Sequence, residues 1–99
     1  MTPQIILHAK EFENEKEFLQ KEIEKNISGK LDSYIQKHFD PQNDNLKLEA
    51  FFSHSNDGFN GKLILSVSHH TFRSEREDFN KLDDLVSHLF DHLKVQLGK

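Results

Sequence analysis

Two apolar stripes at helical spacing constrain the fold more than any other feature of this chain. In one, apolar residues recur every three or four positions from Phe18 to Phe39, and in the other they do so from Leu82 to Leu97. Such a stripe stabilises a helix only when it is buried against another element. Between the stripes, apolar and polar residues alternate with the period of strands that have one buried face. The sequence therefore predicts two amphipathic helices that pack on a sheet.

The first helix is expected to begin near Asn14, because Asn14 and Glu17 have the spacing of a capping box. It is expected to end at Asp40, because Pro41 disfavours helical backbone at the preceding residue. Gly29 lies inside this helix, where it either lets a neighbouring element approach closely or is a local weakness. The apolar stripe of this helix consists of Phe18, Leu19, Ile23, Ile27, Leu31, Tyr34, Ile35 and Phe39.

Four strands are predicted from short apolar or alternating runs. They cover residues 4–9, 46–53, 62–67 and 71–75, and turns are expected at 42–45, 56–58, 60–61 and 68–70. Asp78 is the expected N-cap of the second helix. The stripe of that helix consists of Leu82, Leu85, Val86, Leu89, Leu93 and Leu97, of which Leu85 and Leu89 are expected to be core residues. The order β-α-β-β-β-α predicts an α+β fold with both helices on one face of a four-stranded sheet.

The size and composition of the chain disfavour an enzyme. Its 99 residues predict a single domain over 1–99, and only 34% of them are apolar. A core this small leaves little room for a deep pocket. There is no cysteine for a disulfide or a thiolate nucleophile. We expect no catalytic residues, no cofactor and no small-molecule substrate. The chain is also expected to be cytoplasmic, because it has neither a signal peptide nor an apolar run of membrane-spanning length.

Histidine is the one residue type used unusually. His88 and His92 are four positions apart on the second predicted helix, which is the spacing of two metal ligands, but the stretch lacks the glutamate of the zinc-protease motif. His69 and His70 are adjacent, so in a strand they would point to opposite faces. We therefore expect no metal site, although a histidine-based metal protein is a third interpretation beside the two functions below.

The charge pattern gives limited support for RNA binding. The formal charge is −4 with neutral histidines, which argues against a protein that depends on nucleic-acid phosphates. Lysines nevertheless follow the first helix at positions 16, 21, 25, 30 and 37, and Arg73 and Arg76 lie near the last strand. A stripe of lysines can contact phosphates. Acidic residues alternate with these lysines, as they do on an ordinary solvated helix face.

Two segments resemble the ribosome hibernation-promoting family, also known as ribosome-associated inhibitors or sigma-factor modulation proteins. Residues 30–35, Lys-Leu-Asp-Ser-Tyr-Ile, are similar to the family's Lys-Leu-Glu-x-Tyr-Phe. Residues 79–83, Phe-Asn-Lys-Leu-Asp, are similar to its Tyr-x-Ala-Ile-Asp. After that element the family reads Asp-Lys-Leu-x-Arg-Gln-Leu, whereas residues 87–93 here are Ser-His-Leu-Phe-Asp-His-Leu. His88 thus replaces a lysine and Asp91 replaces an arginine, and the family's basic final turn survives as Lys94 and Lys99.

The resemblance implies a non-catalytic, single-domain factor. Such a factor binds the decoding region of the small ribosomal subunit and inhibits translation in stress or stationary phase. Its partners are the small subunit and its ribosomal RNA, and no membrane. The alternative is a protein-interaction module on the same scaffold that has lost RNA binding. Protonated His88 and His92 would contact phosphate more strongly, so binding is expected to tighten as pH falls from about 8 towards 6. The expected RNA-binding residues are Lys21, Lys25, Lys30, Lys37, Arg73, Arg76, His88, His92 and Lys94.

Overall fold

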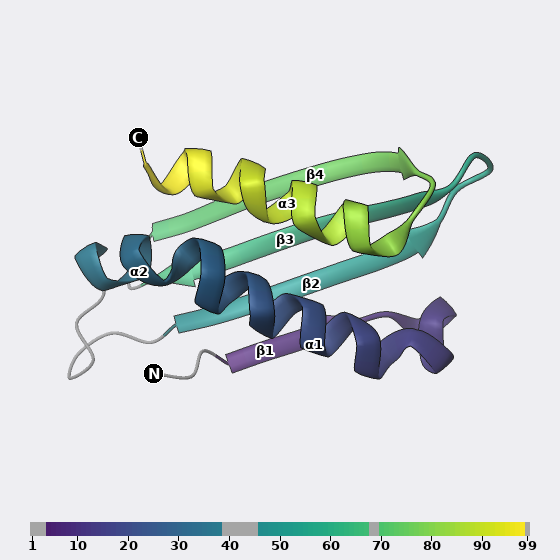
Figure 1. Cartoon of the computed structure of the whole chain (residues 1–99), viewed down its shortest axis with the longest axis horizontal. Coiled ribbons are helices and arrows are strands. Elements are labelled where there is room, and N and C mark those ends of the chain that lie inside the picture. The colour runs from purple at the N-terminus through teal and green to yellow at the C-terminus, as the bar shows by residue number, and fades with distance from the viewer. Residues whose placement is uncertain (1–3, 39–45, 68–69, 99) are drawn as a thin grey trace.

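The computed structural model describes residues 4–38, 46–67 and 70–98. It has the predicted α+β fold: a four-stranded sheet with all of its helices on one face (Figure 1). The elements are, in chain order, strand β1 (Gln4–His8), the 3-10 helix η1 (Lys10–Glu15), helix α1 (Lys16–Asn26), the π-helical segment η2 (Ile27–Leu31), helix α2 (Asp32–His38), strands β2 (Leu46–His54), β3 (Phe59–Val67) and β4 (His70–Phe79), and helix α3 (Leu82–Leu97).

The strands lie in the sheet in their chain order, β1-β2-β3-β4. β1 and β2 are parallel, with Ile5 opposite Leu48, and the two later pairs are antiparallel. A parallel pair needs a long crossover connection. The helical segments from η1 to α2 provide it; α1 passes in front of β1 and β2 in Figure 1, while α3 lies over β3 and β4.

The core lies between the helices and the inner face of the sheet. Alternate residues of β2 and β3 are buried, and so are the predicted stripe residues Leu85 and Leu89 of α3, which confirms both as core residues. α3 also buries Phe90, which the predicted stripe omitted. Phe18 of the first stripe is wrongly assigned to the core, because it is 42% exposed beside the fully buried Leu19.

The first helical stretch starts differently from the prediction. Helical turns begin at Lys10 as the 3-10 helix η1, and α1 follows from Lys16 with Glu15 at its N-cap. No side chain caps that N-terminus, so the predicted capping box of Asn14 and Glu17 does not form. Tertiary packing fixes this start, because Phe12 inside η1 is buried against the core.

The stretch is also not one regular helix, because the π-helical segment η2 interrupts it. The residues that pack on the core there follow each other at a constant spacing of four: Leu19, Ile23, Ile27, Leu31 and Ile35. In an α-helix each step of four residues overshoots one turn by about 40°, so this series would rotate away from the sheet. The wider π turn removes part of that rotation. Gly29 has no neighbour within 4 Å of the position of a Cβ, so the close-approach reading of this glycine is wrong.

One predicted turn and one predicted helix cap lie inside strands instead. Asn60 and Gly61 are in β3, where a Cβ on Gly61 would stand 2.7 Å from Leu89 Cδ1 of α3. Asp78 is not the N-cap of α3 but a residue of β4 with a positive φ of 61°. It lies where the pairing of β3 and β4 shifts register, its backbone N–H donates to Asn60, and its carboxylate accepts a bond from Ser55. The glycine thus permits close packing of α3, and the aspartate forms part of an irregularity in the strand.

The remaining boundaries agree in part. β1 and β2 match the predicted strands within one residue, whereas β3 and β4 extend beyond them to Phe59 and Phe79. The turn over 56–58 is present, with Ser55 N–H donating to the Gly58 carbonyl. The predicted helix end at Asp40, the turn at 42–45, Phe39 and His69 lie outside the described residues. Among the described helices, none combines the length and apolar character that crossing a bilayer requires.

Candidate nucleic-acid interface

The nine expected RNA-binding residues do not form one continuous surface. Most of them are on α1, η2, α2 and α3, and therefore on the helical layer. Arg73 pairs with Ile64 on the opposite, open face of the sheet. Arg76 is on the edge strand β4, where its Nη1 donates to the Glu75 carbonyl at 2.8 Å. The structure therefore brings only some of these residues together.

Lys21 and Lys25 are exposed on α1. Lys21 Nζ lies 3.3 Å from a carboxylate oxygen of Glu17 one turn earlier, and both side chains are largely in water. An exposed pair of this kind contributes little to stability. It nevertheless offsets the charge of Lys21, so α1 presents mixed charge rather than a cationic stripe.

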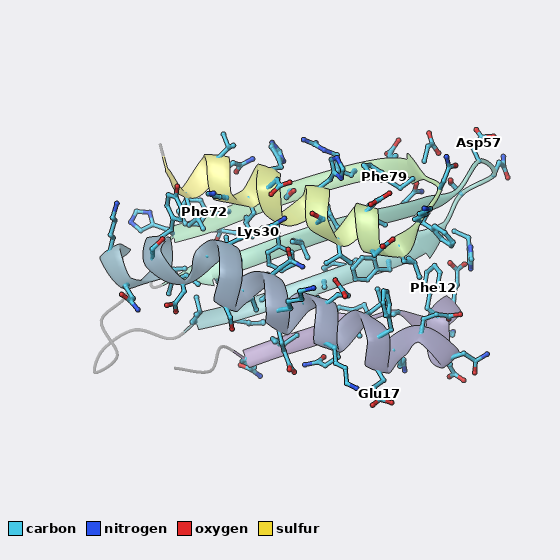
Figure 2. The ribbon with its side chains drawn as sticks, viewed as in Figure 1. Phe12, Glu17, Lys30, Asp57, Phe72 and Phe79 are labelled. Atoms are coloured by element: carbon cyan, nitrogen blue, oxygen red, sulfur yellow. The ribbon has the colours of Figure 1, made fainter. Side chains whose placement is uncertain are left out.

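Lys30 is held inside the fold. Its Nζ donates to the Ser87 carbonyl at 3.1 Å and to Ser87 Oγ at 2.9 Å, and it lies 2.8 Å from Asp91 Oδ1. An ammonium has three N–H donors, and these three contacts use all of them. Figure 2 shows Lys30 between the first helical stretch and α3. Lys30 thus links η2 to α3 through its side chain, and none of its N–H donors remains for a phosphate.

Lys37 and Lys94 form the clearest cationic cluster. Lys37 Nζ of α2 lies 5.7 Å from the centroid of the Tyr34 ring, and Lys94 Nζ of α3 lies 5.9 Å from it. Two helices thus bring two ammonium groups to one aromatic ring, which holds them by cation–π attraction. Neither lysine makes an ion pair within the part of the chain that the structure describes. We call these three residues the Tyr34 cluster.

The two histidines of α3 face β4. His88 packs on Phe79 with ring centroids 4.9 Å apart, and its Nδ1 lies 2.8 Å from the Asp84 carbonyl. His92 Nδ1 lies 3.2 Å from Ser74 Oγ, and its Nε2 lies 3.4 Å from Gln96 Nε2.

Ser74 fixes the role of His92. The Ser74 hydroxyl is buried and donates to the Leu89 carbonyl at 2.8 Å, so its oxygen accepts from His92 Nδ1–H. The Gln96 side-chain amide lies on the other side of the ring, within reach of Nε2. Both nitrogens of His92 thus have partners within the fold. The contact between His88 and the Asp84 carbonyl involves Nδ1 alone.

The sequence matches no model of a known protein family, and no curated protein matches it either.

The open face of the sheet carries a second group of residues, which the sequence analysis did not single out. We define the open face by three rows that cross all four strands: Gln4-Lys47-Ser66-Thr71, Ile6-Glu49-Ile64-Arg73 and His8-Phe51-Lys62-Glu75. The rings of His8 and Phe51 are stacked, with centroids 4.4 Å apart and planes 5° from parallel. Lys62 Nζ lies 4.9 Å from the Phe51 centroid. In the sequence, these residues occupy the positions that alternate with the buried apolar residues of the strands, and that alternation could have identified them as one face.

Glu49 on this face has His8 and Lys47 as its polar neighbours. Its Oε2 accepts a hydrogen bond from His8 Nε2 at 3.2 Å, and its Oε1 lies 3.5 Å from Lys47 Nζ. The hydrogen bond from His8, followed by the charge of Lys47, holds the pKa of Glu49 below its ordinary value, although partial burial acts in the opposite direction. Glu49 is therefore ionised, and the charge of Lys47 offsets its own.

The described residues do not form a metal centre. No three His, Asp or Glu side chains among residues 4–38, 46–67 and 70–98 gather around one point. His88 and His92 have the spacing of two ligands, but His92 uses both nitrogens within the fold. The cations and exposed rings described above can bind anions through charge and flat rings through stacking.

Proposed function

We propose that this chain is a non-catalytic RNA-binding factor that associates with the decoding region of the small ribosomal subunit and inhibits translation in stress or stationary phase. The observation that carries the proposal is the Tyr34 cluster, in which Lys37 and Lys94 converge from two helices. Tyr34 and Lys94 also lie in or near the two segments that resemble the hibernation-promoting family. The α+β order of the elements is the order that this resemblance implies.

The mechanism is occlusion rather than chemistry. A rigid domain held by phosphate contacts fills space that messenger and transfer RNA would otherwise occupy. Phosphate contacts position a protein on RNA without reading its sequence. Arg73 lies on the opposite face from the Tyr34 cluster, and contacts on both faces suit a protein that is enclosed by RNA. Lys30 contributes indirectly, because it joins η2 to α3 and so fixes the position of Lys94 relative to α2.

The test is cosedimentation with isolated small subunits. The parent protein is compared with a Lys37→Gln, Lys94→Gln double variant and with a Lys81→Gln variant as a control. Lys81 is the N-cap residue of α3 and Lys94 lies in its last turn, so most of the length of the helix, about 20 Å, separates them. We expect the parent and the control to cosediment at low salt and the double variant to be released.

Failure of the parent to cosediment at any salt concentration would overturn the proposal. In that case the protein-interaction module is the better interpretation. The neutralisation of Lys30 by Asp91 is the specific observation that favours that alternative, because it removes one cation from the helical layer.

A further inference from the structure

The open face of the sheet is not covered by any element that the structure describes. All the helices lie on the other face (Figure 1). Ile6, Phe51 and Ile64 in its centre are therefore only half-buried, whereas the inward neighbours Leu48 and Leu63 are fully buried. The middle of this face therefore offers partly exposed apolar side chains next to charged ones.

One row of the open face is built for stacking. His8 on β1 and Lys62 on β3 flank Phe51 on the intervening strand β2. The row thus consists of the imidazole ring, the phenyl ring and the ammonium group, in that order. β1 is an edge strand, and the His8 side chain is 47% exposed. A further flat ring can therefore extend the stack at its His8 end.

The charges around this row differ from those of the chain as a whole. The open face has three permanent cations, Lys47, Lys62 and Arg73, against the two carboxylates Glu49 and Glu75. This face is thus positive although the chain has a formal charge of −4. Lys47 and Glu49 are paired with each other, so the surplus charge of this face comes from Lys62 and Arg73 against Glu75.

A shallow hollow of about 730 Å³ adjoins the stacking row and is lined in part by His8, Phe51 and Lys62. Its charged lining is balanced between four cations and four carboxylates, namely Lys10, Lys16, Lys62 and Arg76 against Glu11, Glu13, Glu75 and Glu77. A balanced hollow next to stacked rings suits a neutral flat group better than a phosphate. Arg73, which belongs to the neighbouring row, is a cation outside this balanced lining.

We propose that the open face binds single-stranded nucleic acid, with one base stacked on His8 beside the hollow and the adjacent phosphates near Lys47, Lys62 and Arg73. Stacking on aromatic side chains together with cations along the backbone is the general mode of single-strand binding. A duplex is disfavoured because its bases are already stacked on each other. A second copy of this chain is disfavoured because it would bring two positive faces together. The inference rests on the proposed function only in taking RNA as the natural ligand.

The test uses two substitutions at His8, one with a ring and one without. His8→Phe keeps a stacking ring, and His8→Lys introduces a cation in place of the ring. Both changes are at an exposed position on an edge strand, so the fold is expected to survive. Binding is measured by fluorescence anisotropy with labelled single-stranded oligoadenylate and oligouridylate of about ten nucleotides, and with a duplex of the same length. Phe18→Ala on the helical layer is the control for loss of an exposed ring.

We expect the parent to bind oligoadenylate more tightly than oligouridylate, and both more tightly than the duplex. His8→Phe and Phe18→Ala should bind like the parent. His8→Lys should lose about 5- to 150-fold in affinity for oligoadenylate, the range given by one base–aromatic stack.

Three results would overturn the inference: no binding of single strands by the parent, equal affinities of the two His8 variants, or a parent dimer that dissociates when Phe51 is replaced by Leu. Ribosome binding separates this inference from the proposed function. If the parent cosediments with subunits and the His8 variants bind oligonucleotides equally, only the inference fails. If His8→Lys loses oligonucleotide binding and the parent does not cosediment, only the proposed function fails.

Discussion

Lys30 shows how one residue changes its role once the fold is known. In the sequence it is one lysine of a possible phosphate-binding stripe. In the structure its ammonium is surrounded by Ser87 and Asp91 of α3, more than fifty residues later in the chain. Asp91 is thus the acidic partner of a lysine on another helix. No local pattern could have predicted this, because the contact depends on how two helices pack.

Replacing Lys30 by Met should therefore lower stability. The change removes two hydrogen bonds and an ion pair, and hydrogen bonds to charged groups contribute about 1.5–3 kcal/mol each at most. We expect a loss of about 1–3 kcal/mol in the free energy of unfolding, measured by urea denaturation followed by circular dichroism. Lys25→Met, at an exposed position of α1, is the matched control and should change little. If the Lys30→Met variant is as stable as the parent but binds RNA more weakly, Lys30 contacts RNA and does not stabilise the fold.

Glu49 provides a prediction on pH. Because its pKa is lowered in the folded protein by His8 and Lys47, folding is favoured by this carboxylate above its ordinary pKa of 4.5. That contribution is lost as pH falls through the lowered value, where the carboxylate becomes protonated. In a His8→Phe variant the main cause disappears, so the pKa of Glu49 should rise towards its ordinary value. NMR titration of the side-chain carboxyl carbon measures this directly, and an unchanged titration curve would mean that His8 does not hold Glu49.

At the scale of elements, the contact of α3 with β3 depends on a missing side chain. A Cβ on Gly61 would stand 2.7 Å from Leu89 Cδ1 and 3.3 Å from both terminal methyl carbons of Leu85. All of these leucine atoms belong to fully buried side chains. The pair Asn60-Gly61 predicts a turn, because Asn-Gly is typical of turns. Close packing of a helix on a strand is a rarer reason for a glycine.

Leu89 and Gly61 should be energetically coupled. Leu89→Ala is expected to cost about 2–5 kcal/mol, because it leaves a cavity in the core. Gly61→Ala overpacks the same contact and is expected to cost about 1–3 kcal/mol, reduced by the lower entropy of the unfolded chain. In the double variant the new methyl group enters the cavity, so its cost should be clearly less than the sum. Denaturant unfolding of all four proteins measures the coupling, and additive costs would show that α3 does not rest on Gly61.

The elements were predictable to the extent that their signals are local. The alternation of β2 and the apolar stripe of α3 gave their type and buried face, since period alone determines both. The start of α1, the π-helical segment η2 and the irregularity at Asp78 were not predictable in this way. Each is produced by packing. The start of α1 depends on Phe12, which packs on the core, and η2 depends on the residues spaced by four that pack on the sheet. The irregularity at Asp78 depends on the packing of β4 against β3 and the loop at Ser55.

At the scale of the whole molecule, the fold followed from the order of the elements, whereas the interface did not. Helical spacing says which residues share a side of one helix, but the Tyr34 cluster joins α2 to α3. The open face joins four strands, and it places His8 beside Phe51 and Lys62, which are far from it in sequence. The expected set of RNA-binding residues therefore divides between cations that face solvent, such as Lys37 and Lys94, and residues used within the fold, such as Lys30 and His92.

The salt dependence of binding to the small ribosomal subunit tests the central claim most directly. A logarithmic plot of affinity against salt has a slope that counts the phosphates neutralised by the protein, with somewhat less than one unit for each. We predict a negative slope for the parent and for Lys81→Gln, and a slope smaller by about one to two units for the Lys37→Gln, Lys94→Gln variant. Parallel plots for the parent and the double variant would contradict the account, because they would mean that the Tyr34 cluster does not contact phosphate.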